Sequence, residues 1–439
     1  MLIRFRVQNF LSFKEEVELS MVAGKVQKHP DHIVKSPLKP SVDLLRVGLV
    51  YGANASGKSN LIKAIHFGKF MVTTGVRAKA LIPRKPFKLD GECLSQPSRF
   101  EYEFRYKGTS YIYGFSLDSK YIHEEWLIEI RSASEKELFR RISTIDNNEI
   151  KFNIKVTKED TSLLKLVALG TPTNRLFLQE CTERNIKFFK NVYDWFSDAL
   201  IVIFPTTIHT LVPLTMGNEN EFGKKLIENL IRFNTGVCGY RLQQVPLDSP
   251  DLPQDLIEEM EQSLVEGEGI SLQSRKNKRF FIKKESEELH VYKLVLYHKD
   301  RDCESDVEFE MDEESDGTNR LLDLLPLLFP RKGNSEKVYF IDELDRSLHP
   351  NLSHNFLSTF LENRKEDQII VTTHESSLLD LDFVRRDEIW FVEKNNNGSS
   401  MLYSLEEFSP RYDKDIRKGY MLGRFGAIPI IGHPNFSED

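Results

Sequence analysis

The sequence is poor in cysteine, in long apolar runs and in surplus positive charge, and each absence excludes a class of protein. Its four cysteines lie far apart among 439 residues and form no C-x-x-C pair, which argues against a structural zinc site or a dense disulfide framework. No stretch reaches the roughly 18 apolar residues of a membrane-spanning helix, and the N-terminal segment lacks the apolar core of a signal peptide. With 60 Lys and Arg against 67 Asp and Glu, the chain is not a uniformly basic nucleic-acid-binding protein. We therefore expect a cytoplasmic protein that does not enter a membrane.

What is present is typical of a globular α/β protein with two or three structural units. Hydrophobic residues make up 40% of the chain and charged residues 29%, so a core can form without crosslinks. Residues 1–157 start with an alternating strand and contain strand after strand from Arg99, which predicts an antiparallel β lobe. Residues 158–290 are expected to be a mainly helical insertion. Strands and helices alternate again over 291–439.

The strongest motif is GANASGKS at residues 52–59, a full G-x-x-x-x-G-K-[ST] phosphate loop, or Walker A motif. An exact match arises by chance in about one chain of this length in a hundred. Here the apolar stretch Leu44–Val50 precedes it and a helical pattern follows. The lysine of such a loop contacts the β- and γ-phosphates and its hydroxyl ligates Mg²⁺, whereas an ordinary glycine-rich turn would bind nothing. The predicted nucleotide-binding residues are Asn54, Ala55, Ser56, Gly57, Lys58, Ser59 and Asn60, and Ser59 is also a predicted metal ligand.

Two further apolar strands end in residues suited to phosphate chemistry. Val338–Ile341 is followed by Asp342 and Glu343, and a second strand ends at His374. In a parallel sheet the ligand lies at the carboxyl ends of the strands. We expect Asp342 to hold Mg²⁺, Glu343 to deprotonate the attacking water, and His374 to contact the γ-phosphate or that water. Each strand end taken alone could be structural.

The segment Ser315-Asp316-Gly317 precedes an apolar helical stretch, Leu321–Leu328. Ser315 is first of all a predicted helix N-cap, and this is compatible with a second role in phosphate binding.

The remaining polar clusters are weaker candidates. The cations of the run from Arg275 to Lys284 could contact a nucleic-acid backbone, and Phe280 and Phe281 could stack on bases. Buried aromatics on a strand are the commoner explanation of the two phenylalanines, and a solvated loop explains the run equally well. His349 and His354 lack further metal ligands, so we expect a capping or surface role for them.

The order of these motifs resembles that of ABC-type ATPases of the RecF/SMC/OLD group, in particular the compact bacterial members of the phage-defence and abortive-infection kind, of the RloA type. The resemblance rests on the opening strand MLIRFRVQNFLSF, GANASGKSN, ESDGTNRLLDLLP as a signature motif, FIDELDRSLHP as Walker B plus D-loop, TTHESSLL, and the tail YMLGRFGAIPII. It implies an ABC-type P-loop ATPase head split by an insertion. It also implies that Ser315 and Gly317 contact the γ-phosphate of a nucleotide held by a second subunit. Asp345 falls in the D-loop, and Gln179 is a candidate for the glutamine that lines the metal site.

The resulting hypothesis is an enzyme that hydrolyses ATP to ADP and phosphate with Mg²⁺ in a head-to-head homodimer or higher oligomer. The resemblance implies a sensor or regulatory motor in an antiviral defence system, with a separate effector protein, a nuclease or toxin, as its partner. The alternative is a RecF-like DNA-maintenance ATPase that clamps DNA when ATP drives dimerisation. A P-loop kinase or GTPase is disfavoured, because no N-K-x-D guanine motif is present.

Overall fold

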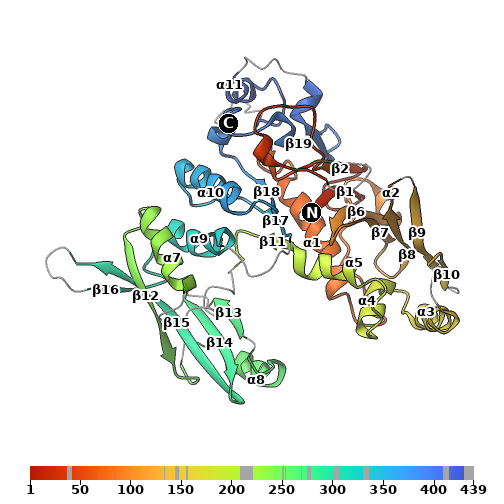
Figure 1. The fold of residues 1–439 in the computed structure, drawn as a ribbon, viewed down its shortest axis with the longest axis horizontal. Coiled ribbons are helices and arrows are strands. Elements are labelled where there is room, and N and C mark those ends of the chain that lie inside the picture. The colour runs from red at the N-terminus through yellow and green to blue at the C-terminus, as the bar shows by residue number, and fades with distance from the viewer. Residues whose placement is uncertain are drawn as a thin grey trace, which may run out of the picture. The chain divides into compact units, whose positions relative to one another are not determined.

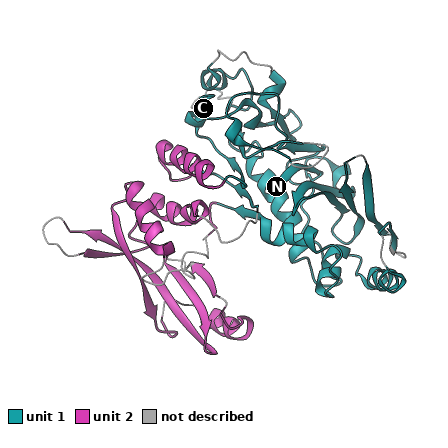
Figure 2. Ribbon diagram, in the orientation of Figure 1, with its two compact units in different colours: residues 1–204, 334–344, 365–439 teal, residues 205–333, 345–364 magenta. Residues whose placement is uncertain are grey.

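The computed structural model describes residues 1–36, 42–132, 134–143, 148–154, 157–207, 221–249, 252, 254–267, 269–273, 278–300, 306–329, 336–408 and 415–429. These form two compact units (Figure 2): unit 1 contains residues 1–204, 334–344 and 365–439, and unit 2 contains residues 205–333 and 345–364. The boundaries of the two units differ from those of the three segments predicted from the sequence. Among the described residues, no helix is both long enough and apolar enough to span a bilayer.

Unit 1 contains a seven-stranded antiparallel sheet (Figure 1). Its strands are, in spatial order, β10 (Asn148–Phe152), β9 (Glu135–Ser143), β8 (Ile122–Ile130), β7 (Thr109–Leu117), β6 (Ser98–Tyr106), β1 (Leu2–Gln8) and β2 (Val17–Ser20). Aromatic residues pair across the central strands, for example Phe100 with Phe115 and Tyr102 with Tyr113. The antiparallel lobe predicted from the alternating aromatic pattern is therefore present, and the opening strand of the chain joins it.

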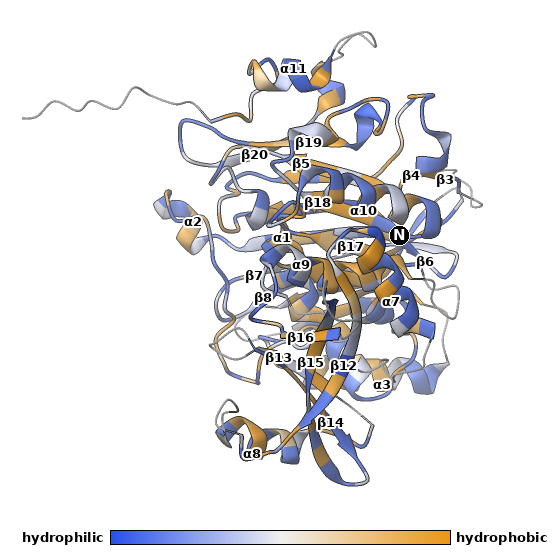
Figure 3. Ribbon diagram, turned by 90° about the vertical axis from the view of Figure 1, so that its left-hand side faces the viewer, coloured by the Kyte–Doolittle hydropathy of each residue, from blue (hydrophilic) through white to orange (hydrophobic). Residues whose placement is uncertain are grey.

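The second sheet of unit 1 is parallel except for its last strand. Its order is β11 (Leu200–Ile203), β17 (Val338–Ile341), β18 (Gln368–Thr372), β5 (Val47–Tyr51), β19 (Ile389–Lys394) and β20 (Ser400–Ser404), with β20 antiparallel to β19. All residues of β5, β17 and β18 are buried, as expected for parallel strands covered on both faces, and the hydrophobic colouring of Figure 3 follows these strands. A separate pair is formed by β3 (Ile33–Val34) and β4 (Leu44–Leu45).

The long helix α1 (Lys58–Thr73) shares one hydrophobic core with both sheets. Leu61 and Ile65 belong to the same buried cluster as Phe5 of the antiparallel sheet and Ile370 of the parallel sheet. The other helices of unit 1 are short: α2 (Gly91–Ser95), α3 (Lys158–Gly170), α4 (Phe177–Glu183), α5 (Lys190–Asp194), α11 (Ile416–Met421), the π-helix η2 (Trp195–Ala199), and the 3-10 turns η1 (Pro30–His32), η4 (Ser376–Leu378), η5 (Arg386–Glu388) and η6 (Leu405–Phe408).

Unit 2 has its own antiparallel sheet. Strands β12 (Val237–Val245), β15 (Glu288–Lys299), β14 (Arg279–Glu285) and β13 (Gly269–Gln273) lie in this order, and β16 (Asp306–Glu310) pairs with β15. Its helices are α7 (Glu221–Arg232), α8 (Gln254–Ser263), α9 (Asp316–Leu324) with the 3-10 turn η3 (Leu325–Leu328), and α10 (Pro350–Asn363).

Residues 158–290, which were expected to be a mainly helical insertion, contain strands as well as helices. Helices dominate only up to Ala199, after which β11, β12, β13 and β14 alternate with α7 and α8. Two of these strands pair with β15, which begins at Glu288, and β13 pairs with β14. The strand-forming signal in this segment lies in β-branched and aromatic residues that the surrounding charges obscure, as in RFFIKKE.

Candidate functional site

The phosphate loop lies between β5 and α1 and has the backbone geometry that its glycines predict. Gly57 has a φ of 122°, and a Cβ atom there would collide with the hydroxyl of Ser400 and lie 2.9 Å from Oγ of Ser12. Ser400 Oγ donates to the carbonyl of Ser56 at 2.5 Å and lies 2.8 Å from Ser12 Oγ, from which it can accept. The loop is therefore supported from outside by serines of two other segments, and only glycine fits at position 57.

Lys58 is buried within this loop. Its ammonium group donates to the carbonyl of Gly52 at 2.9 Å and to that of Ala53 at 3.1 Å. Lys58 is also the first residue of α1, so its charge lies beside the N–H groups of the helix N-terminus. Positive charge and backbone donors thus gather at one point, which is the arrangement that binds phosphate.

The acidic strand end reaches the phosphate loop through a chain of hydrogen bonds. Ser59 Oγ donates to Asp342 Oδ1 at 3.1 Å, although 283 positions separate the two residues. Thr372 Oγ1 donates to the same carboxylate oxygen at 2.7 Å and accepts a hydrogen bond from the backbone N–H of Glu343 at 2.8 Å. The predicted convergence of Lys58 and Ser59 with Asp342 and Glu343 is therefore seen.

Glu343 occupies an unusual backbone conformation, with a φ of 49°. Glu343 is the next residue after the buried Asp342, and its own side chain is half-buried. A left-handed conformation costs free energy in a non-glycine residue and is often kept where a side chain must be aimed. The hydrogen bond from its N–H to Thr372 fixes this turn at the carboxyl end of β17.

His374 follows β18 at the same edge of the parallel sheet. The N–H of Thr373 donates to the carbonyl of Val50 at 3.1 Å, and the Tyr51 hydroxyl donates to the carbonyl of Glu375 at 3.1 Å. These bonds tie the segment after β18 to the end of β5, from which the phosphate loop begins. The imidazole of His374 is exposed, so it is accessible to a ligand at this edge.

The signature segment lies in unit 2, at the start of α9. Ser315 is the N-cap, as predicted, and its Oγ accepts from the N–H of Thr318 at 3.1 Å. Ser315 and Asp316 are exposed. A Cβ at Gly317 would lie 2.8 Å from the carbonyl oxygen of Ser347, which has a φ of 61°. The stretch predicted to be the D-loop therefore packs directly against Gly317 of the predicted signature segment.

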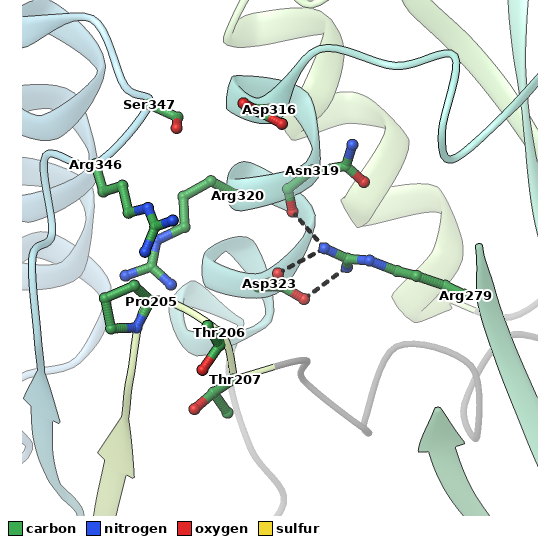
Figure 4. Close-up of a pocket in the computed structure, with 10 residues that line it drawn as sticks. All are labelled: Pro205, Thr206, Thr207, Arg279, Asp316, Asn319, Arg320, Asp323, Arg346 and Ser347. Atoms are coloured by element: carbon green, nitrogen blue, oxygen red, sulfur yellow. Dashed lines mark hydrogen bonds and ion pairs between the residues drawn. The ribbon is translucent and has the colours of Figure 1, made fainter. Parts of the chain in front are cut away.

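A polar cavity of about 210 Å³ lies beside this segment within unit 2 (Figure 4). Arg279 donates to both carboxylate oxygens of Asp323, at 2.8 and 2.9 Å, and so binds β14 to α9. Figure 4 shows the side chains of Arg320 and Arg346 extending toward the same part of the cavity. The full lining is Pro205, Thr206, Thr207, Arg279, Asp316, Asn319, Arg320, Asp323, Arg346 and Ser347.

Comparison with known protein families decides what this arrangement is. A family model described as "AAA domain, putative AbiEii toxin, Type IV TA system" matches residues 49–227 and 250–380, well over half of the chain. The chain belongs to this family. It is accordingly a P-loop ATPase of the AAA/ABC type, with an α/β fold that matches an ABC-type ATPase head. A search of the curated proteins found no match.

Solved structures similar to this ATPase are heads of SMC proteins. They include the "SMC head domain from Thermotoga maritima" (14% identity, 92% of this chain and 98% of that chain, TM-score 0.38). The SMC head "bound to the C-winged helix domain of ScpA" has 14% identity, 93% and 99% coverage and a TM-score of 0.40. A third, from Pyrococcus furiosus and bound to the C-terminal domain of ScpA, has 14% identity, 93% and 97% coverage and a TM-score of 0.33.

Gln179, the candidate for the glutamine of a metal site, lies far from the phosphate loop. Its Nε2 donates to the carbonyl of Thr74 at 2.6 Å, at the C-terminal end of α1. The 16 residues of α1 rise about 1.5 Å each, which places Gln179 roughly a whole helix length from Ser59. The motif FLQE contains a glutamine, as such a site requires. However, its helix, α4, packs against the C-terminal end of α1, whereas the phosphate loop lies at the N-terminal end.

The basic run does not present free cations over its described part. Lys278 pairs with Glu310 at 3.3 Å, Arg279 with Asp323, and Lys283 with Glu285. Phe280 and Phe281 are buried in β14, so they cannot stack on bases. Arg275 and Lys276 lie outside the described residues. The alternative explanation of this run, buried aromatics on a strand, therefore holds.

Sequence reasoning missed Ser12, Ser400 and Thr372. Ser12 and Ser400 lie outside the phosphate-loop motif and meet it only in the folded chain. Thr372 lies inside the apolar strand before His374, and its hydroxyl was a usable signal, since a buried hydroxyl in such a strand needs a partner. His349 is the N-cap of α10, with Nδ1 accepting from the N–H of Asn351 at 3.2 Å, as its predicted capping role requires.

Proposed function

We propose that this P-loop ATPase binds ATP with Mg²⁺ and hydrolyses it at the edge of the parallel sheet in unit 1. The observation that supports this best is the hydrogen-bonded chain Ser59–Asp342–Thr372–Glu343, next to the buried ammonium of Lys58. Lysine, hydroxyl, paired carboxylates and a phosphate loop at one sheet edge suit the hydrolysis of a nucleoside triphosphate.

The donor atoms fit an ATP·Mg²⁺ ligand. Ser59 Oγ and Asp342 Oδ1 are hard oxygen donors 3.1 Å apart, the type of ligand that Mg²⁺ prefers. When bound, Mg²⁺ would neutralise charge on the phosphate oxygens. The residues predicted to cradle the phosphates are Asn54, Ala55, Ser56, Gly57, Lys58, Ser59 and Asn60.

The chain's own residues divide the work between binding and proton transfer. Lys58 binds the β- and γ-phosphates through its ammonium group. To do so, the ammonium group gives up its hydrogen bonds to the carbonyls of Gly52 and Ala53. Glu343 accepts a proton from the attacking water on its carboxylate. His374 orients that water or the γ-phosphate by a hydrogen bond from its exposed ring.

We further propose that two copies share the nucleotide. Ser315 and Gly317 of one subunit would contact the γ-phosphate held by the phosphate loop of the other. This is supported by the exposure of Ser315 at the N-terminus of α9, where a helix dipole favours an anion. Binding of ATP would then close the dimer, and hydrolysis by Glu343 would reopen it.

The biological role that we propose is regulation in an antiviral defence system with a separate effector. The family description, which refers to an AbiEii toxin and a toxin–antitoxin system, supports this setting. The closing and opening of the dimer would change the conformation or activity of the partner protein. A RecF-like DNA clamp gains no support from the basic run, since its described cations pair with acids.

Glu343→Gln tests the proposal. We expect kcat to fall by roughly 10²- to 10⁴-fold, because the general base is lost. Nucleotide binding is retained, so size-exclusion chromatography with ATP should show a persistent dimer. Glu362→Gln, on the exposed end of α10, is the matched control and should keep full activity. Undiminished turnover in Glu343→Gln would refute hydrolysis at this site. Proteins that co-purify with the trapped form would identify the effector.

A further inference from the structure

Two histidines and an aspartate meet at a second site in unit 1. His29, Asp31 and His32 surround the turn η1, and one ligand atom from each lies within 4.8 Å of the other two. The N–H of Arg46, just before β5, donates to the carbonyl of His32 at 2.9 Å. The cluster therefore lies at the amino-terminal end of β5, whereas the phosphate loop leaves its carboxyl end. It takes no part in the nucleotide site.

Hydrogen bonds orient both imidazole rings. His29 Nε2 lies 3.0 Å from the carbonyl oxygen of Leu381, which can only accept, so this nitrogen carries the hydrogen. His32 Nδ1 lies 3.0 Å from the buried carboxylate of Glu388 and donates to it. In the neutral form each ring then has a lone pair on its other nitrogen, Nδ1 of His29 and Nε2 of His32. An oxygen partner on the far nitrogen is the usual arrangement of metal-binding histidines.

The surrounding structure holds the histidine segment in place. The guanidinium of Arg385 donates to the carbonyls of Val26 and Lys28, at 2.9 and 2.7 Å, while Asp387 neutralises its charge. Glu388 also accepts from the N–H of Arg385 at 2.8 Å. Burial raises the pKa of Glu388, and its contact with His32 opposes this rise. The segment is therefore clamped to η5 without any ligand bound.

Asp31 completes a set of three donors on the solvent side. Its side chain is 73% exposed, and its Oδ2 lies 4.0 Å from His32 Nε2, which is too far for a hydrogen bond. Ligands of a tetrahedral ion with bonds of about 2.0–2.2 Å lie roughly 3.4 Å apart. A small rotation of the exposed Asp31 side chain closes this gap, whereas the buried ring of His32 need not move.

We propose that His29, Asp31 and His32 bind a divalent transition-metal ion, with Zn²⁺ as the ion that suits two imidazoles and a carboxylate best. Water would fill the fourth position of a tetrahedral site. Mg²⁺ is disfavoured because it prefers oxygen ligands in octahedral geometry. All three ligands come from residues 29–32, so the ion would stiffen the turn η1, while Leu381 and Glu388 hold the two imidazoles from outside.

Metal titration of the full chain tests this site. After EDTA treatment and desalting, Zn²⁺ is titrated against a chromophoric chelator, with 5 mM Mg²⁺ present to occupy oxygen-rich sites. The variants are His29→Ala and Asp31→Asn, whose side chains reach the surface, so the fold should persist. His123→Ala is the matched control, because His123 also pairs with an aspartate, Asp118 at 2.8 Å, but belongs to β8.

We expect wild type and His123→Ala to bind one more equivalent of Zn²⁺ than the two site variants, or to bind it at least tenfold more tightly. Co²⁺ should give the visible bands of a tetrahedral site without thiolate character in wild type, and these bands should be lost in His29→Ala. Equal Zn²⁺ affinity in all four proteins, or no Zn²⁺ bound by wild type, would overturn the proposal. Neither result would bear on ATP hydrolysis, which is measured separately.

Discussion

Thr372→Val isolates the hydroxyl that links the two acidic residues of the nucleotide site. The side chain is fully buried, and valine has almost the same shape as threonine, so the substitution removes hydrogen bonds without leaving a cavity. One lost bond goes to the carboxylate of Asp342 and is worth about 1.5–3 kcal/mol, and the other comes from the N–H of Glu343 and is worth about 0.5–1.5 kcal/mol. The expected loss in the free energy of unfolding of unit 1 is about 2–4.5 kcal/mol.

Urea unfolding followed by tryptophan fluorescence measures this loss. Trp126, Trp195 and Trp390, the three tryptophans of the chain, all lie in unit 1, so the signal reports on that unit. We also expect kcat for ATP to fall at least about tenfold, because Glu343 loses the bond that fixes its turn. Thr372→Ser keeps the hydroxyl and should restore most of the activity.

Thr373→Val is the control for the stability measurement. Thr373 is equally buried, but its hydroxyl accepts one neutral hydrogen bond, from the N–H of Glu375 at 2.9 Å. It should cost about 1 kcal/mol. If Thr372→Val costs no more than Thr373→Val and keeps full ATPase activity, the hydrogen-bonded chain does not hold the site together.

Three further substitutions test the phosphate loop and the shared dimer site. Lys58→Ala should weaken ATP binding roughly 10- to 100-fold in equilibrium titration, since a charge-assisted contact is lost; unchanged affinity would place the nucleotide elsewhere. Ser315→Arg should bind ATP normally but hydrolyse it poorly, and mixing it with Lys58→Ala should partly restore turnover, because each variant supplies the half that the other lacks. Failure of mixing would argue against sharing. Gly57→Ala should destabilise unit 1 by about 1–3 kcal/mol in urea unfolding. Gly108→Ala is the control and should cost less, because both glycines have a positive φ but, of the two, position 57 alone lacks space for a Cβ. Equal effects of the two substitutions would refute the collision with Ser400.

The sequence predicted those parts of the fold that short-range patterns determine. The alternating aromatics of β6 and β7 and the apolar run of β5 have clear periods, and the phosphate loop has a fixed spacing of glycines. The meeting of Ser59 with Asp342 was also predictable, because both follow buried parallel strands whose carboxyl ends share one edge. Their roles in ATP chemistry stay predictions.

Contacts between remote segments could not be predicted in the same way. Ser400 supports the loop only because β20 pairs beside β19, and nothing in its local sequence indicates this. Gln179 had the right residue type, but tertiary packing placed its helix at the far end of α1. The strands of residues 237–285 alternate too weakly between apolar and charged residues to stand out from a helical pattern.

The order of strands in the parallel sheet has a consequence for synthesis of the protein. The phosphate loop leaves the ribosome early, but β18 and β19, which flank β5 in the completed sheet, begin only at Gln368 and Ile389. Strand β17, which carries the acidic pair, begins at Val338. Such long-range parallel pairing is slow to form and must wait for the last strands to emerge. A nascent chain therefore cannot complete the proposed nucleotide site until nearly all of it has been translated, so truncated products of interrupted translation would lack that site.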